Sequence, residues 1–92
     1  MTTPFETYES VLRDGSYGAS ESLQDLVINL WNGKGWTVDM GRLARNADEE
    51  HWSIALELLE SYRRHGEGDP VFMAIATDLA AERLAARDQD ED

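Results

Sequence analysis

Carboxylates dominate the polar chemistry of this 92-residue chain. Asp and Glu number 19 and Lys and Arg number 8, so the formal net charge is −11 at pH 7. Many carboxylates recur three or four residues apart, which on a helix places them about 5–6 Å from one another. Phosphates along a nucleic-acid strand have a similar separation. We therefore expect a rigid acidic surface that binds a basic protein surface, with association steered by charge and weakened by salt.

The candidate contact residues are carboxylates of the predicted helices together with one aromatic residue. They are Glu21, Asp25, Asp48, Glu49, Glu50, Glu57, Glu60 and Trp36. Trp36 follows a Gly-Lys-Gly turn and, if exposed, would be a good anchor for a partner. We expect Trp31 and Trp52, which fall on apolar stripes, to lie in the core, and a core position is favoured over exposure for Trp36 as well. The alternative for the carboxylates is that they only keep a small protein in solution.

Catalysis and metal binding are not expected. The chain has no cysteine, and its two histidines, His51 and His65, form neither a His-x-x-x-His nor a Glu-x-x-His pair. His65 suits the last turn of a helix, where a cation is favourable. The serines form no Gly-x-Ser-x-Gly elbow, and the glycine-rich segments follow no strand. We predict a non-enzymatic protein with no catalytic residue, no cofactor and no metal.

The same composition bears on partners and compartment. Direct binding to nucleic acid is disfavoured because it needs clustered Lys and Arg. The apolar runs are far shorter than the ~20 residues of a membrane span. The first residues contain neither the basic nor the apolar region of a signal peptide. With no cysteine for disulfides, we expect a reducing, cytoplasmic compartment.

Hydrophobic periodicity predicts an all-α fold, a small bundle of four main helices plus one short helix. The main helices are expected over residues 4–14, 20–32, 48–65 (or from Asn46) and from 70 onward, and the short helix over 40–44. They form a single domain over residues 1–87. Residues 88–92, four of them acidic, are expected to be a disordered tail.

Helix-start and helix-stop signals support these ranges. Residues with capping side chains precede each predicted helix: Thr3, Ser20, Asp39, Asn46 or Asp48, and Asp69. Thr3 with Glu6 has the spacing of a capping box, and Pro4 and Pro70 suit a first helical position. Gly66 is expected to end the fourth main helix.

Apolar stripes define the predicted core. They comprise Phe5, Tyr8, Val11 and Leu12; Leu23, Leu26, Val27, Leu30 and Trp31; Trp52, Ala55, Leu56, Leu59 and Tyr62, widened by Ile54 and Leu58; and Phe72, Ile75, Ala76, Leu79 and Leu84. The last helix is also rich in alanine, which permits close approach of another helix. A homodimer is therefore possible, and a structural or dimerisation module is the second functional hypothesis.

One segment carries a resemblance. Residues 26–33 (LVINLWNG), then Gly35 to Met40 and Leu43, are similar to a small uncharacterised domain of bacterial mobile elements, over about residues 15–59. The aromatic-rich end of that domain is replaced here by an acidic tail. The resemblance implies no activity, but it implies a mobile-element or phage setting. Small acidic proteins there resemble anti-CRISPR and anti-restriction inhibitors, so the implied function is stoichiometric inhibition of a CRISPR effector or another nucleic-acid-handling complex by a nucleic-acid mimic.

Overall fold

The computed structural model describes residues 2–15 and 18–90. These residues form six α-helices, one 3-10 turn and no β-strand, which confirms the all-α prediction. The helices are α1 (Pro4–Thr7), α2 (Glu9–Asp14), α3 (Gly18–Trp31), α4 (Met40–Asn46), α5 (Glu49–His65) and α6 (Pro70–Asp90), with the 3-10 turn η1 over Gly66–Gly68.

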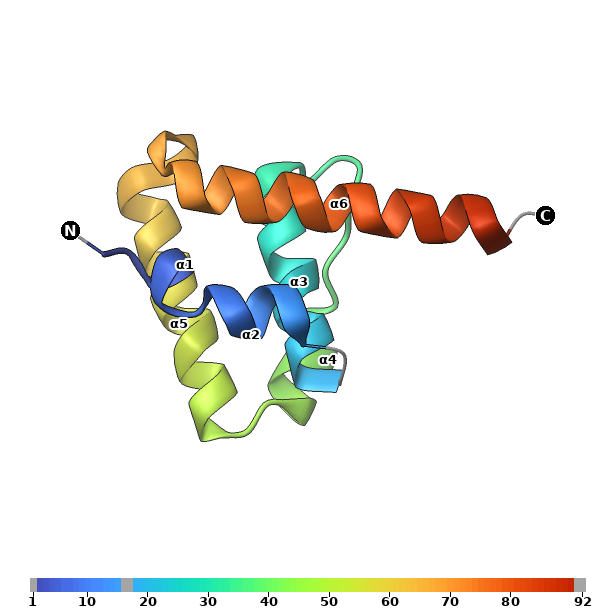
Figure 1. The fold of residues 1–92 in the computed structure, drawn as a ribbon. Helices are drawn as coiled ribbons and strands as arrows, with labels where there is room; N and C mark the ends of the chain where they lie inside the picture. Colours follow the sequence, from blue (N-terminus) through green and yellow to red (C-terminus); the bar gives the residue numbers. More distant parts are fainter. Residues whose placement is uncertain (1, 16–17, 91–92) are drawn as a thin grey trace.

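Helix α6 is the longest element, and α1, α2 and α3 pack against it (Figure 1). Helices α3 and α5 run across its direction, α4 packs on α3, and the two short N-terminal helices fill the space between α3, α5 and α6. The last turns of α6 extend beyond the rest of the fold (Figure 1). The result is a small bundle with one projecting helix end.

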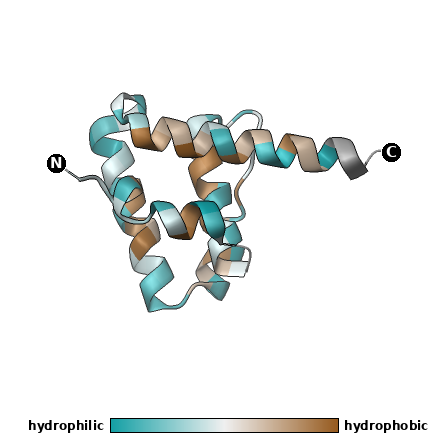
Figure 2. Ribbon diagram, viewed as in Figure 1, coloured by the Kyte–Doolittle hydropathy of each residue, from teal (hydrophilic) through white to brown (hydrophobic). Residues whose placement is uncertain are grey.

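The core is centred on three aromatic rings from three helices. The ring of Phe72 lies 4.9 Å from that of Phe5 and 5.2 Å from that of Tyr62, centroid to centroid. Aromatic pairs at these separations are favourable beyond the area that they bury. Apolar segments recur along α3, α5 and the first half of α6 (Figure 2). The remaining fully buried large residues are Leu12, Leu23, Val27, Ile28, Leu43, Leu58 and Ile75.

The predicted first helix is divided in two. Tyr8 has φ −105° and ψ 17°, which ends α1 and begins α2. Helix α1 packs on α5, α2 packs on α3, and both contact α6. The bend lets Phe5 and Leu12 both reach the core although they face different helices.

Three of the predicted N-caps are confirmed. Asp39 accepts a hydrogen bond from the backbone N–H of Arg42 (2.9 Å), and Asp48 accepts one from that of His51 (2.8 Å). Asp69 accepts from the backbone N–H groups of residues 71 and 72 at 2.9 and 3.3 Å. Gly66 ends α5 with φ +54°, a conformation that glycine adopts without strain. These local signals fix where the helices begin and end.

Thr3 occupies the predicted N-cap position of α1 but lacks the predicted capping bond, and the cap predicted at Ser20 is wrong. Thr3 makes no side-chain cap bond, so it forms no capping box with Glu6. Ser20 is buried inside α3 and donates to the carbonyl of Val11 (2.8 Å). Gln24, one turn later, donates to the carbonyl of Leu12 at 2.6 Å. Side chains of α3 thus donate to carbonyls at the end of α2, and the Val11 carbonyl also accepts from the backbone N–H of Gly15 at 3.2 Å.

The stripe predicted for α5 is rotated. Ile54, Ala55 and Leu58 are buried as expected, but Trp52 is 37% exposed and Leu56 is 51% exposed. Helix α5 has apolar residues around more than half of its circumference, and only the side that faces the other helices can be buried. Leu84 of α6 is likewise 51% exposed, although the neighbouring Arg83 contacts α3.

The C-terminal boundary also differs from the expected one. Helix α6 continues to Asp90, past the domain boundary predicted at residue 87. The backbone of residues 88–90 is thus helical, whereas the sequence led us to expect a disordered tail from 88 onward. Residues 91–92 lie outside the described residues.

Two ion pairs hold α6 against its neighbours. Arg13 of α2 donates to Asp78 at 2.7 Å and to Glu9 at 2.6 Å. On another side of α6, Arg83 pairs with Asp25 of α3. The arginines therefore connect helices that are distant in sequence.

The tight end of α2 generates a stability prediction. A Cβ at Gly15 would overlap the Ser20 side chain and lie 2.7 Å from the Val11 carbonyl oxygen. Gly15→Ala should lower the free energy of unfolding by about 1–3 kcal/mol, the usual cost of overpacking. Gly18→Ala is the matched control, since a Cβ there meets no atom within 4 Å. Urea denaturation followed by circular dichroism measures both, and equal stability of the two variants would contradict the packing described.

Candidate interaction surface

The N-terminal end of α5 carries three consecutive carboxylates. Asp48 is the N-cap, and its Oδ1 also lies 2.7 Å from Nδ1 of His51. The hydrogen bond from the His51 backbone N–H, followed by that of its side chain, lowers the pKa of Asp48. Glu49 and Glu50 are exposed, and no hydrogen bond or ion pair joins either carboxylate to another described residue. Their charge is therefore available to a partner.

The two predicted carboxylates of α3, Asp25 and Glu21, differ in how closely they pair with arginines of the same chain. Asp25 is half-buried and forms the ion pair with Arg83, whose other nitrogen donates to the Gln24 side chain at 3.2 Å. Glu21 is exposed, and its carboxylate lies 3.9 Å from Arg42 of α4. Asp25 thus acts in holding α3 against α6, whereas Glu21 remains largely open to solvent.

The carboxylates in the second half of α5 also have partners within the chain. Glu57 accepts a hydrogen bond of 2.6 Å from the Tyr8 hydroxyl, and this bond is the main reason why the pKa of Tyr8 is raised. Glu60 accepts hydrogen bonds from Arg63 and Arg64, each at 3.0 Å. These bonds lower the pKa of Glu60 to about 2. The negative charge of Glu60 is offset by its neighbours.

Trp36 is half-buried, so its side chain is not the fully exposed partner-binding anchor that the sequence allowed. The guanidinium carbon of Arg87 lies 4.6 Å from the centre of its ring, a cation–π contact between the loop and α6. Its backbone N–H donates to the Asn32 carbonyl (3.1 Å), and its own carbonyl accepts from the Asn29 side chain (2.8 Å). Trp36 therefore fastens the 32–39 loop to the fold.

Trp52 and Leu56 form an exposed apolar strip that the sequence interpretation assigned to the core. With Glu49 they lie at positions i, i+3 and i+7 of α5, which share one side of a helix. We call Glu49, Trp52 and Leu56 the α5 outer face. The signal that could have revealed it is the excess of apolar residues in α5 over what one buried stripe requires. Of the predicted contact residues, Glu49 belongs to this face, Asp48 precedes it, and exposed Glu60 follows Leu56 by four residues on the same side of the helix. Glu50 lies toward the side of α5 that faces Tyr8, whose pKa its charge helps to raise.

The two histidines do not form a site together. His51 is engaged with Asp48 at the start of α5, and His65 lies at the end of the same helix. Among residues 2–15 and 18–90 no group of three or more His, Asp or Glu side chains is arranged to hold a metal ion. In the same part of the chain, none of the helices has the length and apolar character needed to cross a membrane.

Comparison with known proteins does not place the chain in a family. No family model matches it, and no curated protein or solved structure is significantly similar to it. The resemblance to a domain of mobile elements stays a prediction.

The Glu60 cluster gives a testable pH dependence. Because the pKa of Glu60 is about 2 in the folded protein and ordinarily 4.5, the unfolded chain takes up the proton first as the pH falls. The contribution of Glu60 to stability is therefore complete above pH 4.5 and is lost between 4.5 and about 2.

Carboxyl NMR titration of Glu60 measures this directly. The double variant Arg63→Gln/Arg64→Gln should return its midpoint toward 4.5. Arg45→Gln, which removes an exposed arginine of α4, should not move it. A midpoint near 4.5 in the unmodified protein would contradict the cluster geometry.

Proposed function

We propose that this protein is a small acidic binding protein that acts as a stoichiometric inhibitor. It occupies a basic, nucleic-acid-binding surface of a larger complex, in the manner of anti-CRISPR or anti-restriction proteins. The observation that supports this most directly is the α5 outer face, where exposed Trp52 and Leu56 follow the carboxylates of residues 48–50.

The chemistry of this surface suits a basic partner. The unshared carboxylates of Glu49 and Glu50 attract cationic side chains and raise the association rate. Trp52 supplies a large apolar anchor, and tryptophan is enriched among residues that dominate binding energy. A basic surface with an apolar spot beside its cationic groups is complementary to this arrangement. The net charge of −11 adds long-range attraction.

Charge reversal tests the electrostatic part of the proposal. Glu49→Lys/Glu50→Lys should weaken capture of the partner from a bacterial lysate by about tenfold or more. Glu67→Lys/Glu82→Lys, which changes the net charge equally at exposed sites on η1 and α6, is the matched control. Captured proteins should elute as salt rises toward physiological strength. Capture that responds neither to salt nor to the Glu49/Glu50 reversal would refute the proposal.

A pair of leucines tests the apolar part. Leu56 and Leu84 are both helical and both 51% exposed, but only Leu56 lies on the α5 outer face. Leu56→Ala should weaken partner capture by several-fold, whereas Leu84→Ala should leave it unchanged. The captured complex should also lose nucleic-acid binding in proportion to the amount of inhibitor added. Continued nucleic-acid binding at saturation would show that the wrong surface is occupied.

A dimerisation module is the second candidate function. Helix α6 exposes Leu84 together with Ala81 and Ala85, which are small enough for a close helix contact. Under this alternative, sedimentation equilibrium would find a dimer that Leu84→Ala dissociates and Leu56→Ala does not. The same two variants thus separate the two functions.

A further inference from the structure

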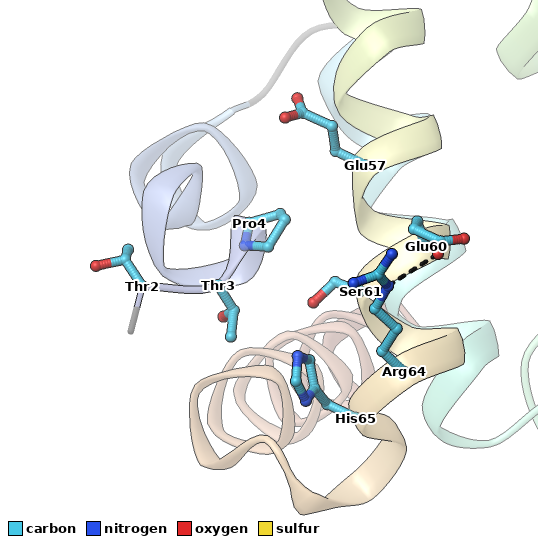
Figure 3. A pocket seen from close by; sticks show the side chains of 8 residues that line it. All are labelled: Thr2, Thr3, Pro4, Glu57, Glu60, Ser61, Arg64 and His65. Atoms are coloured by element: carbon cyan, nitrogen blue, oxygen red, sulfur yellow. Dashed lines mark hydrogen bonds and ion pairs between the residues drawn. The ribbon is translucent and has the colours of Figure 1, made fainter.

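A hollow opens where α1, the end of α5 and the start of α6 meet. One part, of about 320 Å³, lies between the N-terminal turn of α1 and the second half of α5 (Figure 3). A second part, of about 480 Å³, continues to the first turn of α6. The two parts share Thr3, Arg64 and His65 in their linings, so they are direct neighbours.

Unpartnered polar atoms are concentrated in this hollow. Within the described residues, four buried side-chain oxygens lack a hydrogen-bond partner, and three of them belong to residues that line it: Thr3, Ser61 and Asp69. Ser61 is 5% exposed and Asp69 is 6% exposed. A buried polar group without a partner costs about 1–3 kcal/mol. Three such groups around one hollow indicate that something with complementary polar atoms belongs there.

The orientation of the side chains agrees with this reading. Figure 3 shows the Ser61 hydroxyl directed from α5 toward the N-terminal turn that carries Thr3, with the His65 ring beside them. Pro4 forms an apolar wall on the α1 side. Asp69 uses Oδ1 to cap α6 and has Oδ2 to spare. Two hydroxyls and one carboxylate oxygen therefore lie just beneath the walls of the hollow, covered by neighbouring atoms, beside a short apolar surface.

These groups favour a cation that donates hydrogen bonds. A carboxylate only accepts, and the hydroxyls can accept as well. The guanidinium of Arg64 already donates to Glu60, and the further carboxylates of Glu6 and Glu57 lie at the rim. We propose that this hollow binds an alkylammonium or guanidinium group, with Ser61, Thr3 and Asp69 as acceptors. The inference does not depend on the proposed function, because it needs no nucleic-acid-handling partner.

The same cationic group can come from a free small molecule or from a Lys or Arg side chain of another protein. The experiment is a ¹⁵N-HSQC titration with ethylguanidinium, with n-butylammonium, and with a blocked Gly-Arg-Gly peptide, each at millimolar concentrations and low salt. Shifts of the amides of residues 3, 61 and 69 with the free cations indicate a small ligand. Shifts with the peptide alone indicate a partner side chain.

Variants assign the binding to the proposed acceptors. Ser61→Ala should weaken binding by about two- to tenfold, the value of one hydrogen bond, while leaving the unfolding temperature of the free protein no lower than before. Ser22→Ala is the matched control, because its hydroxyl is equally buried and unpartnered but lines neither part of the hollow. Asp69→Asn keeps an N-cap oxygen and should also weaken binding.

Two results would overturn the inference. One is the absence of shifts at these amides with all three probes. The other is equal binding of tetramethylammonium, which has the same charge but no N–H group and therefore cannot donate to the three acceptors. Unchanged affinity in Ser61→Ala together with Asp69→Asn would count against it in the same way.

Discussion

The contact of Phe72 with Phe5 and Tyr62 is the interaction on which the rest of this fold depends. It joins α6, α1 and α5 at one point, and Phe72 is fully buried there. A chain of this size has a small core, so a single aromatic cluster carries a large share of its burial. The cluster fixes the side of α5 that faces inward. It thereby leaves Trp52 and Leu56 outward and holds the start of α1 beside Ser61.

Ion pairs within the chain determine which carboxylates are neutralised and which remain exposed. Arg13, Arg83 and the Arg63–Arg64 pair take up carboxylates at places where helices meet or where one helix ends. Exposed pairs contribute little stability individually. Because the chain has only 8 Lys and Arg for 19 Asp and Glu, the arginines engaged in these pairs are not available to other carboxylates. Glu49 and Glu50 are among the carboxylates that have no basic partner in the described part of the chain. Unpaired negative charge is therefore distributed unevenly over the surface of the molecule.

Local features of the fold could be predicted from the sequence, and features that depend on packing could not. Asp39, Asp48 and Asp69 cap helices because a capping bond spans only two or three residues of the same segment. Ser20 carries the same signal but is drawn into the interface with α2, which no local pattern reports. The side of α5 that faces the core was predicted incorrectly, because apolar residues occur around more than half of the helix and more than one side could have been buried. Among the candidate contact residues, Asp25 and Glu57 were indistinguishable from Glu49 until their partners Arg83 and Tyr8 were placed beside them.

The division of the N-terminal segment at Tyr8 has a consequence for local unfolding. Helices α1 and α2 have four and six residues, well below the ~12–15 that an isolated helix needs to persist in water. They hold their shape only while docked on α3, α5 and α6, so this segment is the natural low-energy opening unit of the domain. Its undocking removes one wall of the hollow around Ser61 and also withdraws Phe5 from the aromatic cluster that orients α5. One segment of eleven residues, 4–14, thus supports both the wall of the hollow and the orientation of α5.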